Sequence, residues 1–447
     1  MSKQVRWLWE QSAEWVDKGL ISQEQAGQIR GLYPEPKTAL PWGTIIFSGI
    51  GAGIAGLGVI LLLAYNWPAI PKAVKLAIIF LALAGLHAGG IRLFLQGERW
   101  RQLGEAVCVM GSMLFGAGIW LVAQIYHIEE HYPNGFLIWG LGALVLAWAM
   151  PSLAQGLLAT AVLCIWGCSE GWGFGTAVHW APLFLLGGLG ALAWRLRSPL
   201  LLSFVLTAFA ATLCANVHVV EGALLLRVLL SFAALFVAVA ILAARHRWFP
   251  EAAAVWGFFG WLGFLVCLYL LTFPGIVEEL LGLRWRHQSP TRWVPMQFVY
   301  GWGPFVLALL AWCRVAWPWR PGAPRETRPQ DCGFHYWLIP LTAILCQVLA
   351  SAQVAGEKWG VASVFNLVFL ALAAAWVARG CRQGLLRPTI LGSLLLVALT
   401  AARYFDLFDS LALRGLVFLA VGGLLFVEGI FFRRARRRVQ TAEEAKA

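Results

Sequence analysis

Long apolar runs, each about as long as a membrane-spanning helix, fill nearly all of the chain after Trp42. A helix needs about 20 mainly apolar residues to cross roughly 30 Å of hydrocarbon. Of the 447 residues, 60% are hydrophobic and only 13% are charged, far fewer charges than a soluble domain carries. The sequence therefore predicts an all-α polytopic integral membrane protein with about 14 transmembrane helices.

The predicted spans are separated by turns that carry most of the charged residues. They lie approximately at 43–64, 72–95, 103–124, 134–150, 151–168, 177–195, 199–217, 220–243, 250–272, 296–317, 334–352, 359–379, 385–404 and 411–432. The fourth and fifth spans meet at Pro151. We expect six regions: a cytoplasmic amphipathic helical hairpin (1–40), the first membrane helices (41–150), the middle membrane helices (151–272), an extracytoplasmic amphipathic loop (273–295), the C-terminal membrane helices (296–432) and a basic cytoplasmic tail (433–447).

The formal net charge of +12 comes from basic residues that gather in alternate loops. If the N-terminus is cytoplasmic, most of the 34 Lys and Arg residues fall on the cytoplasmic side, as the positive-inside rule predicts. Both termini are therefore expected in the cytoplasm, and the number of spans is expected to be even. No soluble basic domain is present to bind nucleic acid, so membrane lipid is the expected partner of the basic tail. No cleavable signal peptide is predicted, because the first apolar run follows a charged segment.

Residues 1–40 have the pattern of two short amphipathic helices. Gly19 is expected to stop the first helix, and Ser22 with Gln25 forms a capping box for the second. A unit of this size buries too little surface to be stable alone. We expect it to dock on the membrane domain, on the lipid headgroup layer or on a cytoplasmic protein partner.

Two patterns resemble cofactor or metal sites, but their surroundings argue against both. A G-x-G-x-x-G at Gly51, Gly53 and Gly56 lies in an apolar span without a preceding strand, so no dinucleotide is expected. His127 and His131 frame an H-x-x-E-H pattern, but Pro133 follows at once and no third ligand is evident, which favours a solvated turn. The nine cysteines contain no CxxC pair. We predict no cofactor, no metal and no catalytic residue.

Four segments together resemble a known family: LISQEQ, GVILLLAYNWPAIPKAVKL, GAGIWLVAQIYHI and, near the C-terminus, ARYFDLFDSLALRGLVFLAVGGLLF. In these motifs the chain is similar to the bacterial predicted membrane proteins of domain of unknown function 2157, most clearly over the first 150 residues or so. The resemblance implies a multi-pass protein of the bacterial cytoplasmic (inner) membrane. It brings no activity, substrate or catalytic residue.

Polar residues within or beside the spans are the candidate site residues, because polar groups in lipid are costly and often functional. Residues at the predicted outer rim are Asn66, Gln124, His127, His131, Arg403, Asp406 and Asp409; those inside the membrane are His87, Arg227 and Asn366; a possible anion site consists of Arg284, Arg286 and Arg292. We expect Arg227 to pair with Glu170 or Glu221, and Glu105 to pair with Arg101. An amphipathic stretch after Ile276 is expected to lie flat in the interface.

Three functions fit these features. Transport or translocation of a lipid-like or small amphipathic substrate is favoured, because the spans contain few charges and many glycines. The alternative is a non-catalytic membrane scaffold or sensor whose hairpin, residues 1–40, binds a cytoplasmic partner. An enzyme acting on a polyprenyl-phosphate-linked substrate is the third, since arginines in the 273–295 loop suit a phosphate but no catalytic base accompanies them.

Overall fold

The fold is taken from a computed structural model of the whole chain. It describes residues 3–32, 54, 70–128, 131–176, 178–217, 222–246, 249–280, 294–316, 334–352, 358–406, 419, 422–423 and 426. These residues form helices and turns, with no strand among them, which confirms the all-α prediction. The chain divides into two compact units, Met1–Ala77 and Ile78–Ala447, which are described separately.

The N-terminal unit contains helices α1 (Lys3–Asp17) and α2 (Gln23–Gly31). The predicted capping box is present, because the Ser22 side chain accepts from the Gln25 backbone and the Gln25 side chain accepts from the Ser22 backbone. Gly19 follows α1 with a φ of 68°, a left-handed conformation that glycine adopts without strain. The two helices are tied together by Arg30, whose Nε donates to Ser12 Oγ at 2.8 Å.

The remaining helices are α4 (Lys72–Leu95), α5 (Glu98–Tyr126), α6 (Pro133–Ala149), α7 (Leu153–Cys168), the π-helix η2 (Ser169–Phe174), α8 (Trp180–Arg195), α9 (Pro199–Val217), α10 (Gly222–His246), α11 (Pro250–Leu270), α12 (Pro274–Leu280), α13 (Val294–Ala316), α14 (Phe334–Ala352), α15 (Lys358–Gln383) and α16 (Leu386–Asp406). The division predicted at Pro151 is confirmed, with α6 ending before it and Ser152 capping α7.

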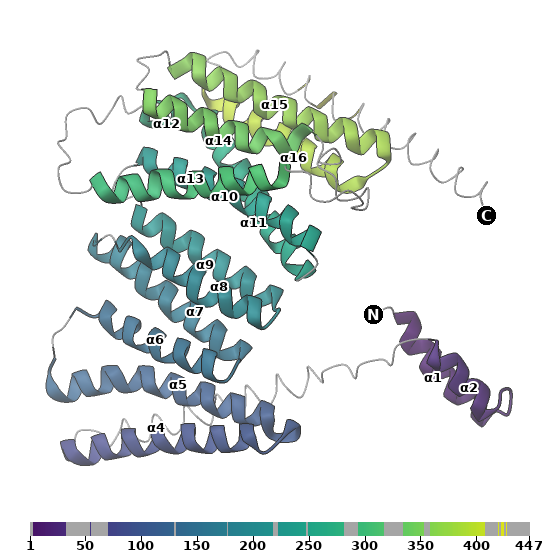
Figure 1. Cartoon of the computed structure of the whole chain (residues 1–447), viewed down its shortest axis with the longest axis vertical. Helices are drawn as coiled ribbons and strands as arrows, with labels where there is room; N and C mark the ends of the chain where they lie inside the picture. The colour runs from purple at the N-terminus through teal and green to yellow at the C-terminus, as the bar shows by residue number, and fades with distance from the viewer. Residues whose placement is uncertain are drawn as a thin grey trace. The chain divides into compact units, whose positions relative to one another are not determined.

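Very short turns join α4 to α5, α6 to α7, α8 to α9 and α15 to α16, so these helices run antiparallel. The turns lie on the right in Figure 1. Arginines accompany them: Arg92, Arg99, Arg101, Arg195, Arg197, Arg379, Arg382 and Arg387. We call this side the basic end. The other side, where α5, α7 and α9 end and α6, α8 and α10 begin, is called the polar end.

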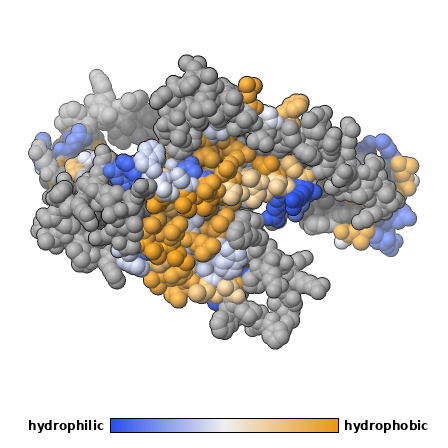
Figure 2. Space-filling model, turned by 90° about the horizontal axis from the view of Figure 1, so that it is seen from above, coloured by the Kyte–Doolittle hydropathy of each residue, from blue (hydrophilic) through white to orange (hydrophobic). Residues whose placement is uncertain are grey.

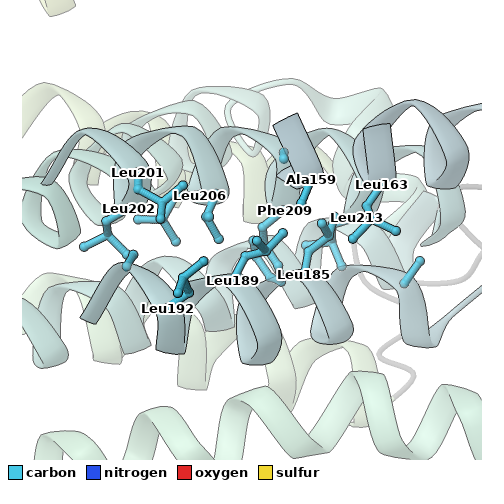
Figure 3. Close-up of a cluster of buried hydrophobic side chains, with 14 of the residues drawn as sticks. Ala159, Leu163, Leu185, Leu189, Leu192, Leu201, Leu202, Leu206, Phe209 and Leu213 are labelled. Atoms are coloured by element: carbon cyan, nitrogen blue, oxygen red, sulfur yellow. The ribbon is translucent and has the colours of Figure 1, made fainter. Parts of the chain in front are cut away.

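Two hydrophobic clusters hold the helices together, and α10 contributes to both. The first lies among α7, α8, α9 and α10; Figure 3 shows leucines of α8 and α9 pointing toward one another. Leu224, Val228 and Phe232 of α10 belong to this cluster, at a spacing of four residues. Leu226 and Leu230 face a second cluster that includes α11 to α15. Because α10 is apolar on opposite faces, it lies between neighbours on both sides.

Eight helices in the described part of the chain are long and apolar enough to cross a membrane. Three further apolar helices are shorter: Pro133–Ala149, Tyr336–Ser351 and Leu386–Ala401. Large apolar side chains remain exposed along α4, α13 and α14, and Figure 2 shows hydrophobic residues gathered over a broad part of the face seen there. Such surface is stable in lipid. The molecule is therefore a helical membrane protein, while the predicted count of about 14 spans and the orientation of the termini stay predictions.

One local prediction, the pairing of Glu105 with Arg101, is wrong. Glu105 accepts from the Ser152 hydroxyl at the start of α7, while the Arg101 guanidinium lies over the Phe94 ring, 4.9 Å from its centroid. The expected pairing of Glu105 with Arg101 does not form, because each side chain meets a neighbouring helix instead. The stretch expected to lie flat in the interface begins as α12, whose Val277 is fully buried in the second cluster. Its position in the interface stays a prediction.

Candidate functional site

The candidate site residues fall into three groups in the structure. Asn66, Asp409, Arg284, Arg286 and Arg292 lie outside the described residues, as do the side chains of Arg403 and Asp406 in the last turn of α16. Gln124 and His127 are exposed at the end of α5. The remaining four, namely His87, His131, Arg227 and Asn366, make contacts that indicate what each side chain does.

His87 and Asn366 join helices. The His87 ring bonds the Leu83 carbonyl through Nδ1 at 3.0 Å and fills a notch at Gly111, where an added Cβ would lie 2.7 Å from the ring. Asn366 of α15 donates to the Thr272 carbonyl at 3.0 Å and so connects α15 to the end of α11. Both contacts are typical of polar residues that fix helix packing in membranes.

His127 ends α5 in a left-handed conformation with a φ of 53°. The helix that would place His127 and His131 on one face therefore stops before the first histidine. His131 instead bonds Glu170, with Nε2 donating to both carboxylate oxygens at 2.9 Å. In the described part of the chain, no group of three or more metal-binding side chains is found.

Glu170 is buried on the π-helix η2, directly after α7. The Thr176 hydroxyl donates to its carboxylate as well as to its carbonyl, and Phe174 lies against the His131 ring. A π-helix carries one extra residue per turn and is frequent at functional sites. In η2, Glu170 is buried. The next residue, Gly171, lies so close to α9 that an added Cβ would be 2.2 Å from the Ala215 carbonyl oxygen.

The fully buried Asn216 fixes the neighbouring turn at the polar end. Its amide nitrogen donates to the carbonyls of Gly167 at 2.9 Å and Thr212 at 2.8 Å, and its oxygen accepts from the Val178 backbone at 2.8 Å. The amide uses its donors and its acceptor together, which ties α7, α9 and the start of α8 into one unit.

Arg227 lies in α10 and donates through Nε to the Gln347 side-chain oxygen of α14 at 3.1 Å. Its guanidinium also faces α13, because an added Cβ at Gly301 would lie 3.4 Å from Nη2. The adjacent Tyr300 is buried, and its ring centroid lies 5.9 Å from that of His179. Of the two carboxylates expected to pair with Arg227, Glu170 bonds His131 and Thr176, and Glu221 lies outside the described residues.

This arrangement defines the class of protein: a polytopic helical membrane protein with two buried polar groupings at one end of its helices. A family model described as "Predicted membrane protein (DUF2157)" matches residues 13–156, about a third of the chain. The resemblance seen in the motifs is thereby confirmed for this part. Neither the curated proteins nor the solved structures contain a match to the chain.

The matched residues include the hairpin helix α2, all of α4 to α6 and His131, but neither Glu170 nor Arg227. Sequence reasoning had singled out His131 and Arg227 without their partners. Glu170 and Gln347 lie 39 and 120 residues away along the chain, so no local pattern pointed to either pairing.

Proposed function

We propose that the protein translocates a lipid-like or small amphipathic substrate across the bacterial inner membrane. The observation that supports this best is Arg227, a cation within a span whose Nε donates to the Gln347 side-chain oxygen. An ionisable side chain at membrane depth is costly, and such residues commonly mark substrate pathways. The basic end belongs in the cytoplasm by the positive-inside rule, which directs the polar end outward.

The test is lipid movement in vesicles. The purified full-length chain is reconstituted into dioleoylphosphatidylcholine vesicles that hold a trace of fluorescent phospholipid, and dithionite reports how fast inner-leaflet lipid reaches the outer leaflet. Arg227→Met keeps an apolar stem and removes the charge, so we expect movement to fall to the protein-free rate. Arg245→Met is the matched control, because Arg245 lies in the same helix at the basic end and donates to the Val315 carbonyl.

Two results would count against translocation. Wild-type vesicles no faster than protein-free vesicles, for lipids and small amphipathic solutes alike, would remove the proposal. Equal loss in the Arg227→Met and Arg245→Met variants would show that movement depends on the integrity of α10 and has no link to the polar end.

A scaffold or sensor is the second candidate, supported by the N-terminal hairpin. Trp7, Leu20 and Leu32 are large apolar side chains that remain exposed on this small unit. Apolar residues in such positions suit contact with a protein partner or with the headgroup layer. Deleting residues 1–40 separates the two functions: a scaffold loses its cytoplasmic partner, whereas a translocator keeps lipid movement.

A further inference from the structure

Two cysteines lie together in the last part of α7. Cys164 and Cys168 are four residues apart, so their side chains share one face of the helix. Their sulfur atoms are 4.0 Å apart, and both side chains are half-buried. Cys164 Sγ also lies 4.0 Å from the Ala208 carbonyl oxygen, so the pair faces α9. A thiol is a weak hydrogen-bond donor, and contacts of this kind compete poorly with a metal–sulfur bond.

The helix keeps the two thiols from joining to each other. A disulfide requires Cβ atoms about 3.5–4.5 Å apart. Residues four apart on a helix have Cβ atoms about 5–6 Å apart. Both cysteines belong to α7, which ends at Cys168, so closing the bond would require the last turn of α7 to unwind. The pair therefore stays a dithiol whose two sulfurs face a common ligand.

The distance between the sulfurs suits a metal ion that both of them bind. A metal–thiolate bond is about 2.3 Å long, so an ion between two sulfurs 4.0 Å apart lies at bonding distance from each. Zinc takes at least three protein ligands, and no group of three or more Cys, His, Asp or Glu side chains suited to a metal occurs among the described residues. Soft sulfur ligands select Cu(I), whose filled d shell is satisfied by two sulfurs.

We infer that Cys164 and Cys168 together bind one soft monovalent metal ion, Cu(I), through their thiolates. The thiols release their protons to water when the ion binds, and the oxidation state of the metal does not change. The site lies directly before η2, next to the polar end of the span, where the ion and the protons have access to water. This inference goes beyond the proposed function, because it holds whether or not the chain moves lipid.

The experiment offers Cu(I) to detergent-purified full-length protein without oxygen, with ascorbate present, in competition with the coloured chelator bathocuproine disulfonate. Cys164→Ser and Cys168→Ser each replace one sulfur with a hydroxyl. Loss of an outer-shell partner alone weakens metal binding about 10- to 100-fold, so we expect loss of one of the two ligands to weaken Cu(I) binding by about 100-fold or more. X-ray absorption of the wild-type protein at one Cu(I) per chain should show two sulfur neighbours.

Cys381→Ser is the matched control, because Cys381 is also half-buried but lies on α15. It should bind Cu(I) as the wild type does. Cu(I) should also raise the unfolding midpoint of the wild type and of Cys381→Ser, but not that of either α7 variant, because a ligand stabilises only the chain that binds it. This readout separates metal binding from a purely structural role of the two cysteines.

A second variant keeps the test independent of any single substitution. Of the nine cysteines, it retains Cys164 and Cys168 and has serine at the others, and it should still bind one Cu(I). Wild-type affinity in both α7 variants, or an equal loss in Cys381→Ser, would overturn the inference. Fewer than two sulfur neighbours at the copper would also overturn it, as would displacement of Cu(I) by an equal concentration of Zn²⁺.

Discussion

The contact between α4 and α5 provides a sharp test of the packing, because it is made by glycine backbones. An added Cβ at Gly104 would lie 2.4 Å from the Phe94 nitrogen, 2.6 Å from the Gly90 oxygen and 2.8 Å from the Phe94 Cα. All three neighbours are backbone atoms, which cannot rotate away. Ordinary contact begins near 3.4 Å, so Gly104→Ala must move the helices apart by about 1 Å at this point.

Overpacking of this kind costs about 1–3 kcal/mol, and rigid backbone neighbours place Gly104→Ala near the upper value. Gly89→Ala on α4 is the matched control, since nothing lies within 4 Å of its added Cβ. That substitution should stabilise the helix by up to about 1 kcal/mol, because alanine loses less backbone entropy than glycine. The same substitution, Gly→Ala, should therefore lower the stability at position 104 and raise it at position 89.

The assay is reversible unfolding of the detergent-purified chain in increasing dodecyl sulfate, followed by tryptophan fluorescence. We expect the free energy of unfolding to fall for Gly104→Ala and to hold or rise for Gly89→Ala. Equal stability of the two variants would refute the reasoning, because it would mean that α4 and α5 do not approach at Gly104.

Two further predictions concern ion pairs of different burial. Glu170→Gln keeps one acceptor for His131 but loses the second, charge-assisted hydrogen bond. We therefore expect the free energy of unfolding to fall by about 2 kcal/mol in the same assay. An unchanged unfolding midpoint would mean that the pairing contributes nothing to stability. Lys358→Met breaks the 2.8 Å ion pair with Glu278, whose partners are 38% and 34% exposed. Because the pair is partly exposed, the free energy of unfolding should fall by less than about 1 kcal/mol. A fall of more than about 2 kcal/mol would contradict the view that this pair contributes little.

The polar end combines two groupings that differ in composition. Around Glu170, the hydroxyl of Thr176 and the imidazole of His131 satisfy the carboxylate within the chain. Around Arg227, the guanidinium Nε donates to the Gln347 side-chain oxygen, and the Gln347 amide nitrogen has no partner among the described residues. The first grouping therefore holds the turn in place, and the second joins α10 to α14.

The positions of the helices follow from the sequence alone. Spans predicted at 72–95 and 334–352 coincide with α4 and α14, and the break at Pro151 separates α6 from α7. A residue's transfer into lipid depends on its own side chain and its immediate neighbours, and every backbone polar group in lipid must be bonded within its own helix. Both conditions are local, so a run of apolar residues is sufficient to predict them.

The partnerships were decided only by the tertiary structure. Glu105 bonds Ser152 instead of Arg101, His131 bonds Glu170 across a π-helix, and Arg227 bonds Gln347 from a helix 120 residues away. Lipid solvates apolar side chains as well as another helix does, so hydrophobicity does not select which helices meet. Close packing of glycines and the satisfaction of buried donors make that selection, and both depend on which residues the folded chain brings together.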